Sequence, residues 1–283
     1  MGYAAPMRIE FLKMHGLGND FIVFDAPAGD CAPPDSRTFS RLADRHTGIG
    51  FDQALMLEPP HNPETRAYYR IFNADGGEVE QCGNGARCVA ALLYSRAPQL
   101  GRSFLLDSPG GRIGARIRED GLVSIDMGVP NFNPAGLPFE ASSESYLYPL
   151  NVNGRETDIG AVSMGNPHAV LNVPDVDTAS VDRLGPAIEH HPRFPKRTNV
   201  AFMQILDRGH IRLRVHERGV GETRACGTGA CGAVAVGRRH GLLDAEVEVT
   251  LKGGKVWISW PGGQEHLWMT GPVANVFAGT VDV

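Results

Sequence analysis

A stretch that decides the fold occurs twice, once in each half of the chain. Residues 69–86 read YRIFNADGGEVEQCGNGA, and residues 213–230 read LRVHERGVGETRACGTGA. Seven of these 18 aligned positions are identical without a gap, and Cys226 follows Cys82 by 144 positions, about half the chain. A period of this length is far too long for a solenoid, so the repeat indicates duplication of a whole domain.

A second repeated motif, Gly-Asn followed by an apolar run, supports this interpretation. Gly18-Asn19 and Gly165-Asn166 each precede an apolar run, over residues 21–24 and 169–173. The segments after the two cysteines, 86–96 and 230–240, are rich in helix-forming residues and are closed by Pro98 and Gly241.

Short alternating patterns predict strands before the cysteines and elsewhere in both halves. We expect these strands at residues 9–13, 21–25, 67–72, 103–106, 111–118, 122–127, 200–206, 211–216, 246–252 and 255–260, with a hairpin turn at Gly253-Gly254.

The predicted class is therefore α+β, with two similar pseudo-twofold-related lobes, each a mostly antiparallel sheet wrapped around a central helix. The Pro- and Gly-rich segment near residue 135 divides the chain into an N-terminal lobe over 1–135 and a C-terminal lobe over 136–283. The last strands could cross back to the first lobe.

Composition and charge argue against a nucleic-acid-binding, membrane-spanning or secreted protein. The 283 residues include 27 Lys and Arg against 32 Asp and Glu, a formal charge of −5 without a basic stripe, so no nucleic-acid partner is expected. No apolar run is long enough for a membrane span, and residues 1–7 lack the pattern of a secretory signal. We expect a cytoplasmic protein with reduced thiols.

The five cysteines do not form a metal-binding pattern. Their spacings, Cys-x5-Cys and Cys-x4-Cys, are not those of a zinc site, so no metal is expected. Cys88 and Cys231 are predicted to face the core, and Cys31, in a Pro-rich loop, receives no role.

Cys82 and Cys226 differ from these because each lies at the predicted start of a helix, before Gly-x-Gly. A helix start offers N–H groups and partial positive charge, which stabilise a thiolate and bind a carboxylate. Two such thiols across one bound anion would suit a two-base racemase. The alternative is a pair of buried structural cysteines, the commonest state of a cysteine thiol.

Six segments carry a resemblance to a known family: MHGLGNDFIVFDA, GIGFDQ, FNADGGEVEQCGNGARC, SMGNPHAV, RTNVAFMQI and ERGVGETRACGTGACGAVAVG. In this order they resemble diaminopimelate epimerase over residues 8 to about 279. The resemblance implies a pyridoxal-independent isomerase that needs no cofactor and interconverts LL- and meso-2,6-diaminopimelate in bacterial lysine and peptidoglycan precursor synthesis. It also implies an active site between two lobes and a homodimer.

The resemblance assigns roles to individual positions. Cys82 and Cys226 would be the catalytic acid/base thiols, with His168 and Glu217 tuning their pKa values. The positions implied to bind substrate are Asn19, Gln53, Asn73, Gly83, Asn84, Asn166, Asn199, Glu217, Arg218, Gly227 and Thr228. Taken alone, the four asparagines outside the cysteine motifs, Asn19, Asn73, Asn166 and Asn199, are equally consistent with turn or cap residues.

Two positions qualify the resemblance. Phe277 stands where members of the family often carry a Tyr linked to the dimer interface, and the residues before Met7 extend beyond the usual start.

Two alternative functions are a proline or hydroxyproline racemase-type enzyme with the same thiol pair, and a non-catalytic amino-acid-binding protein of this fold. The first would not need the distal set Asn73, Asn199, Glu217 and Arg218.

Overall fold

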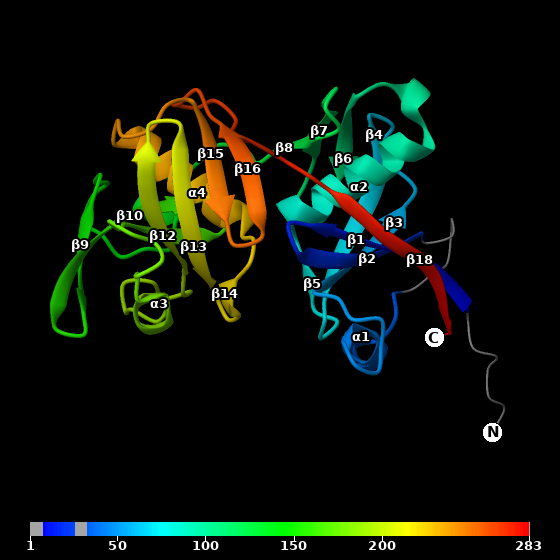
Figure 1. The fold of residues 1–283 in the computed structure, drawn as a ribbon, viewed down its shortest axis with the longest axis horizontal. Coiled ribbons are helices and arrows are strands. Elements are labelled where there is room, and N and C mark those ends of the chain that lie inside the picture. The colour runs from blue at the N-terminus through cyan, green and yellow to red at the C-terminus, as the bar shows by residue number, and fades with distance from the viewer. Residues whose placement is uncertain (1–7, 26–32, 283) are drawn as a thin grey trace. The chain divides into compact units, whose positions relative to one another are not determined.

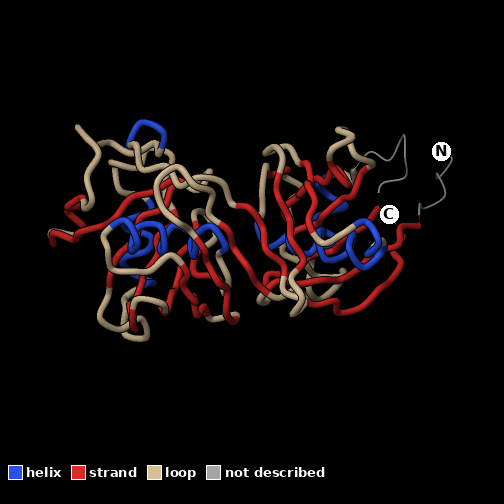
Figure 2. The backbone as a smooth tube through the Cα atoms, turned by 90° about the horizontal axis from the view of Figure 1, so that it is seen from above, coloured by secondary structure: helices blue, strands red, loops and turns tan. Residues whose placement is uncertain are grey.

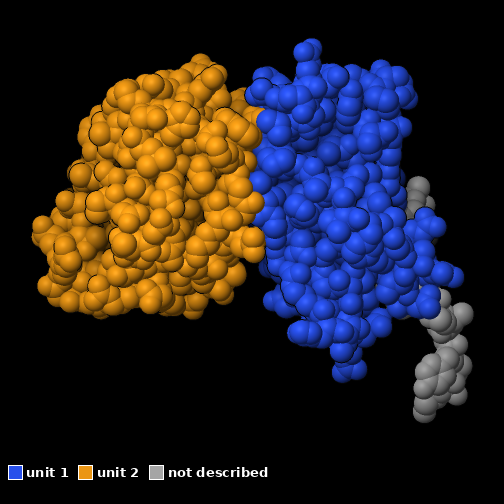
Figure 3. Space-filling view, viewed as in Figure 1, with its two compact units in different colours: residues 1–125, 271–283 blue, residues 126–270 orange. Residues whose placement is uncertain are grey.

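The computed structural model describes residues 8–25 and 33–282, which form two compact units (Figure 3). The first unit consists of the residues up to Ile125 and those from Gly271 onward, and the second unit spans Asp126–Thr270. The boundary predicted at residue 135 lies about ten residues beyond this division, and the final strand belongs to the first unit. Cys31 and the residues before Met7 lie outside the described residues.

In its described residues, the first unit is a mixed sheet with two α-helices. Its strands lie in the order β18-β1-β2-β3-β4-β6-β7-β8, with β5 paired to β4. Two neighbouring pairs are parallel, β2 with β3 and β4 with β6, and the other pairs are antiparallel. The elements are β1 (Arg8–Gly16), β2 (Asn19–Asp25), α1 (Ser36–Ala43), β3 (Gln53–Glu58), β4 (Thr65–Asn73), β5 (Glu78–Val79), α2 (Gly83–Arg96), β6 (Ser103–Asp107), β7 (Ile113–Ile117), β8 (Val123–Asp126) and β18 (Ala274–Asp282), with a 3₁₀ turn at Pro98–Leu100.

The second unit repeats this arrangement. Its strands lie in the order β9-β10-β11-β12-β13-β15-β16-β17, with β14 paired to β13, and the parallel pairs are β11 with β12 and β13 with β15. The elements are β9 (Tyr148–Val152), β10 (Arg155–Ser163), β11 (Pro167–Asn172), α3 (Val181–Glu189), β12 (Asn199–Asp207), β13 (His210–Glu217), β14 (Gly221–Thr223), α4 (Gly227–Arg239), β15 (Glu246–Leu251), β16 (Gly254–Ser259) and β17 (Trp268–Gly271), with a 3₁₀ turn at Pro134–Gly136.

The two units match element by element, which confirms the α+β class and agrees with the duplication inferred from the repeated cysteine stretch. In both, a short helix (α1 or α3) connects the first parallel pair, and a longer helix (α2 or α4) connects the second. Each cysteine motif therefore occupies the same place in its unit, between a short hairpin strand and the longer helix (Figure 1).

The longer helices form the centre of each unit. In each unit of Figure 2, strands lie on both sides of the central helical segments, whereas shorter helical segments lie at the periphery. Helix α2 buries nine of its 14 residues and α4 nine of its 13, and both are rich in Gly and Ala. Small side chains let the surrounding strands approach closely: a Cβ at Gly160 of β10 would lie 2.3 Å from Cγ1 of Val236 in α4.

Several sequence expectations need correction. Both long helices begin three residues earlier than predicted, because the Gly-x-Gly segments that looked like turns form the first helical turn. Helices α1 and α3 were not predicted, since they are short and α3 contains Pro186. The hairpin between β15 and β16 turns at Lys252-Gly253, one residue before the predicted position, because Leu251 pairs with Gly254.

Candidate active site

Cys82 and Cys226 occupy equivalent positions, each as the N-cap residue immediately before its helix. Cys82 has an extended backbone and its Sγ accepts a hydrogen bond from the Gly85 N–H at 3.5 Å. Each thiol is therefore beside the positive end of a helix dipole, and the following residues, Gly83 and Gly227, open the first turn. This local geometry can hold a carboxylate on backbone N–H groups.

In the first unit, a chain of side-chain hydrogen bonds connects two predicted substrate-binding residues. The guanidinium of Arg87, which is fully buried, donates to Asn84 Oδ1 at 2.7 Å. Asn84 Nδ2 donates to Asn19 Oδ1 at 3.0 Å, and Asn19 Nδ2 donates to Asp52 Oδ2 at 3.0 Å. Because the chain begins at a cation and ends at an anion, it fixes the orientation of both amides.

Gln53 and Asn73 form a second pair in this unit. They are direct partners in the antiparallel pairing of β3 with β4, and Gln53 Nε2 donates to Asn73 Oδ1 at 2.9 Å. Both side chains are partly exposed at the ends of their strands. The structure thus places four predicted residues of the N-terminal half in two hydrogen-bonded groups, Asn19 with Asn84 and Gln53 with Asn73.

In the second unit, a similar chain leads toward Cys226. His168 Nε2 lies 2.8 Å from Asn166 Oδ1, Asn166 Nδ2 donates to Thr228 Oγ1 at 3.4 Å, and Thr228 Oγ1 lies 3.8 Å from Cys226 Sγ. Burial lowers the pKa of His168 to about 3, and the charge of Arg218 acts in the same direction. His168 is therefore neutral, donates through Nε2 and leaves Nδ1 without a hydrogen-bond partner among the described residues.

Glu217 is the ionisable group that acts on Cys226. Burial raises the pKa of the Cys226 thiol well above its ordinary value, and the charge and hydrogen bond of Glu217 raise it further. This differs from the sequence expectation that the helix start makes the thiol more acidic, because burial and a neighbouring carboxylate outweigh the helix end here. Thr223 Oγ1 donates to Glu217 Oε1 and thereby orients the carboxylate.

The turn after β13 carries Arg218, whose side chain is exposed. Its backbone N–H donates to Asn199 Oδ1 at 3.0 Å, and Asn199 Nδ2 donates to the Pro167 carbonyl at 3.1 Å. The guanidinium donates to the Lys196 carbonyl at 3.1 Å. Asn199 is itself 3% exposed, so in this structure it connects the Arg218 turn to β11.

Cys88 and Cys231 lie in the core, as predicted. Cys88 and Cys231 are completely buried in α2 and α4, which confirms that they face the core. Burial raises the pKa of Cys88 to about 12.

Sequence reasoning missed three residues near the candidate site: Arg87, Thr223 and Glu189. Arg87 and Glu189 are charged side chains that are 0% and 3% exposed, which no single-sequence pattern reveals. Thr223 carries a weak signal, because it lies within the repeated stretch three residues before Cys226.

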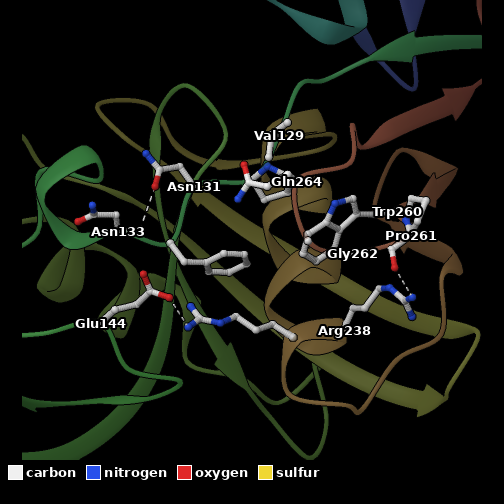
Figure 4. A pocket seen from close by; sticks show the side chains of 13 residues that line it. Val129, Asn131, Asn133, Glu144, Arg238, Trp260, Pro261, Gly262 and Gln264 are labelled. Atoms are coloured by element: carbon white, nitrogen blue, oxygen red, sulfur yellow. Dashed lines mark hydrogen bonds and ion pairs between the residues drawn. The ribbon is translucent and has the colours of Figure 1, made fainter.

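A separate cavity of about 880 Å³ lies wholly within the second unit. Figure 4 shows Gln264, Trp260 and Asn131 around it, with Arg238 donating to the Pro261 carbonyl at 2.6 Å. Arg239 is ion-paired with Glu144 at 2.6 Å. Neither Cys226 nor any other predicted site residue lines this cavity, and both arginines already hold an acceptor.

Within the described ranges, no group of three or more His, Cys, Asp or Glu side chains is placed to hold a metal ion. No helix within them combines the length and apolar character needed to cross a membrane.

Comparison with known proteins gives matches over nearly the whole chain. The family described as diaminopimelate epimerase matches residues 11–133 and 160–276. Curated relatives named diaminopimelate epimerase include one from Nitrosomonas europaea, 55% identical over 98% of this chain and 100% of its own. Another, from Thioalkalivibrio sulfidiphilus, is 53% identical with the same coverage of both chains.

Solved structures with much lower identity share the fold. A hydroxyproline epimerase from Agrobacterium vitis superposes with a TM-score of 0.68 at 16% identity, covering 98% of this chain and 93% of the other. A PhzF-family protein from Bacillus anthracis gives 0.69 at 16% identity, covering 98% and 100%. At this identity the likeness concerns the fold alone, whereas the family match and the relatives above 50% identity show that the chain belongs to the diaminopimelate epimerase family.

Proposed function

We propose that this protein interconverts LL- and meso-2,6-diaminopimelate by proton transfer between two cysteines, without a cofactor. The observation that carries the proposal is the pair of cysteines at equivalent helix starts, in a chain that belongs to this family. In the reaction, a thiolate removes the α-proton and the electron pair of the broken C–H bond passes into the carboxylate. A thiol on the opposite face then protonates the same carbon, and the configuration is inverted.

The helix starts supply the electrostatic part of this mechanism. The developing charge on the α-carboxylate would be stabilised by N–H groups of Gly83-Asn84 and Gly227-Thr228, because such donors gain strength as the negative charge grows. Asn19, Gln53 and Asn166 would surround the reacting end.

The environment of Cys226 favours one starting assignment. Its raised pKa and its hydrogen bond to Glu217 make it a thiol, the form that donates a proton. Cys82 Sγ, which accepts the Gly85 N–H, would then be the base in that direction. His168 would act on Cys226 indirectly, through Asn166 and Thr228.

The distal amino acid group would be recognised by a second set of residues, which includes Glu217, the neighbour of Cys226. The planar guanidinium of Arg218 suits a carboxylate, and the carboxylate of Glu217 together with the amides of Asn73 and Asn199 suits an ammonium group. A proline or hydroxyproline substrate lacks this distal group, so the set favours diaminopimelate over the racemase-type alternative.

The decisive experiment is incubation with LL-diaminopimelate in D₂O without added cofactor, followed by proton NMR. Loss of the α-proton signal with formation of the meso isomer is expected. Exchange with proline or hydroxyproline but not with diaminopimelate would overturn the substrate, and exchange with none of them would favour a binding protein.

Substitution of each thiol tests the two-base assignment. Cys82→Ser and Cys226→Ser should each abolish epimerisation while retaining ligand binding, because serine replaces the proton-transferring atom with little change of shape. Cys88→Ser, in the core of α2, is the control for loss of a thiol elsewhere. Near-normal turnover in either catalytic variant would refute the assignment.

The proposal includes a homodimer and a cytoplasmic location. Strand β18 pairs with β1 along one edge and exposes Val276 and Phe277, which are 54% and 48% exposed. Contiguous exposed apolar surface is a feature of protein–protein interfaces, and these two neighbouring side chains would contribute to such a surface. Reduced catalytic thiols require a reducing compartment. Sedimentation of the wild type and of Phe277→Glu tests the dimer, which the charged substitution should weaken.

A further inference from the structure

Helix α3 ends at a buried carboxylate that none of the proposed catalytic steps uses. Glu189 is 3% exposed, and its two oxygens have different partners, one near the end of β13 and one in the turn that follows it. Oε2 lies 2.8 Å from His216 Nε2, and Oε1 accepts the Gly219 backbone N–H at 2.9 Å. These partners flank Glu217 and Arg218 on both sides in the sequence.

The position of this carboxylate is costly for the fold. A helix C-terminus carries partial negative charge, so an anion at the last residue of α3 is unfavourable. Burial also raises the pKa of Glu189, but hydrogen bonds from His216 and Gly219 outweigh it, so the pKa is lowered and the group is ionised. Two further side chains lie at longer distance from Oε1, with Arg197 Nη1 at 3.7 Å and His190 Nε2 at 4.0 Å.

The packing of α3 is arranged around the same contact. A Cβ at Gly185 would lie 2.6 Å from Cγ of His216, so a glycine is needed for the helix to approach this side chain. On the other side of the turn, Asn199 holds the Arg218 N–H. The backbone of residues 218 and 219 is thus fixed by two buried acceptors on different elements.

We propose that Glu189 is a positioning residue, which holds the Glu217–Gly219 turn so that Arg218 and Glu217 are preorganised for the distal amino acid group of the substrate. The proposal rests on the proposed function for the identity of that group. In this role, the side chain of residue 189 must be long enough to contact both His216 and Gly219. A neutral oxygen at the position of Oε1 is sufficient to accept the Gly219 N–H.

The test measures binding of LL-diaminopimelate by calorimetry in a Cys82→Ser background, where the ligand is not converted. Glu189→Ala should raise Kd about tenfold, equivalent to about 1.4 kcal/mol. Glu189→Gln keeps an oxygen at the same reach and should restore binding to within about twofold of the parent. Glu189→Asp keeps the charge but is one methylene shorter, so it should bind nearly as weakly as Glu189→Ala.

Ile188→Val is the matched control, because Ile188 is the fully buried neighbour in the same helix and contributes to the core. It should lower thermal stability and leave Kd unchanged. The inference is overturned if Glu189→Ala and Glu189→Asp bind like the parent, or if Ile188→Val weakens binding equally. If Glu189→Ala does not fold, the comparison of Glu189→Asp with Glu189→Gln decides.

A second measurement needs no ligand. Hydrogen exchange of the Gly219 amide should be faster in Glu189→Asp than in Glu189→Gln, and an equal rate would contradict the contact as a restraint on the turn. Failure of the Cys82→Ser parent to bind diaminopimelate, together with absence of exchange in the wild type, would refute the proposed function instead. The amide measurement would still decide whether Glu189 holds the turn.

Discussion

Removal of the negative charge of Glu217 should make the thiol of Cys226 more acidic. The carboxylate of Glu217 raises the pKa of this thiol through its charge and through a hydrogen bond that favours the protonated sulfur. In Glu217→Gln the amide oxygen can still accept the S–H, so chiefly the charge is lost. A like charge at hydrogen-bond distance shifts a pKa by about 1 to 3. The variant should therefore favour the thiolate by about 1.4 to 4 kcal/mol relative to the wild type.

The assay is the pH dependence of modification by a small methanethiosulfonate, with Cys226 identified by peptide mass spectrometry. Because only the thiolate reacts, the midpoint of the rate profile reports the pKa and does not depend on how accessible the buried sulfur is. The midpoint should move to lower pH in Glu217→Gln. Burial remains in the variant, so the pKa should stay above that of an exposed thiol.

Glu222→Gln provides the matched control. Glu222 lies in the short neighbouring strand β14, but its charge is taken up by Arg214 and Lys252. This variant should leave the midpoint of the pH–rate profile of Cys226 modification unchanged. An unchanged midpoint in Glu217→Gln, or an equal shift in both variants, would refute the reasoning.

Three further outcomes are expected. Burial raises the pKa of Asp20, but hydrogen bonds from Arg45 and Lys13 outweigh this effect, so the pKa in the folded protein lies below the ordinary value of 3.8. The stability that this shift contributes is present above pH 3.8 and is lost as the pH falls through the folded-state pKa. Asp20→Asn should therefore lower the free energy of unfolding by about 1 to 3 kcal/mol at neutral pH, and urea titrations should show this difference shrinking below pH 3.8. Arg218→Lys should raise the KM for diaminopimelate about tenfold or more in steady-state kinetics, because a point charge replaces a bidentate fork, and an unchanged KM would contradict the distal role. Gly160→Ala should destabilise the protein by about 1 to 3 kcal/mol in denaturant unfolding, since its Cβ would lie 2.3 Å from Cγ1 of Val236, and wild-type stability would show that the strand and α4 can separate at little cost.

Much of the architecture is predictable because it is carried by local patterns. Alternating apolar residues place β4 and β13, and the small apolar residues after each cysteine place α2 and α4. The prediction fails where the signal is short or misleading. Helix α3 has nine residues and an internal proline, so no periodic pattern marks it, although its last residue is the buried Glu189.

For the candidate site, the sequence names candidate residues but does not reveal how they interact. The repeated cysteine motif and the resemblance name Cys226, Glu217 and Asn166. They do not reveal that Asn166 connects His168 to Thr228, or that burial, together with Glu217, raises the pKa of the Cys226 thiol. The helix-start argument alone gave the wrong direction for the pKa of this thiol, because it left out burial.

The sequence by itself determined the duplication, the α+β class and the two helix-start cysteines, since repeated motifs and periodicity depend only on residues near one another along the chain. Only the tertiary structure decided the electrostatics. Whether a charge such as Arg87 or Glu189 is buried depends on strands and helices far away in the sequence that exclude water from it. Desolvation and hydrogen bonding act over a few ångströms in space, so the protonation and orientation of the site follow from packing.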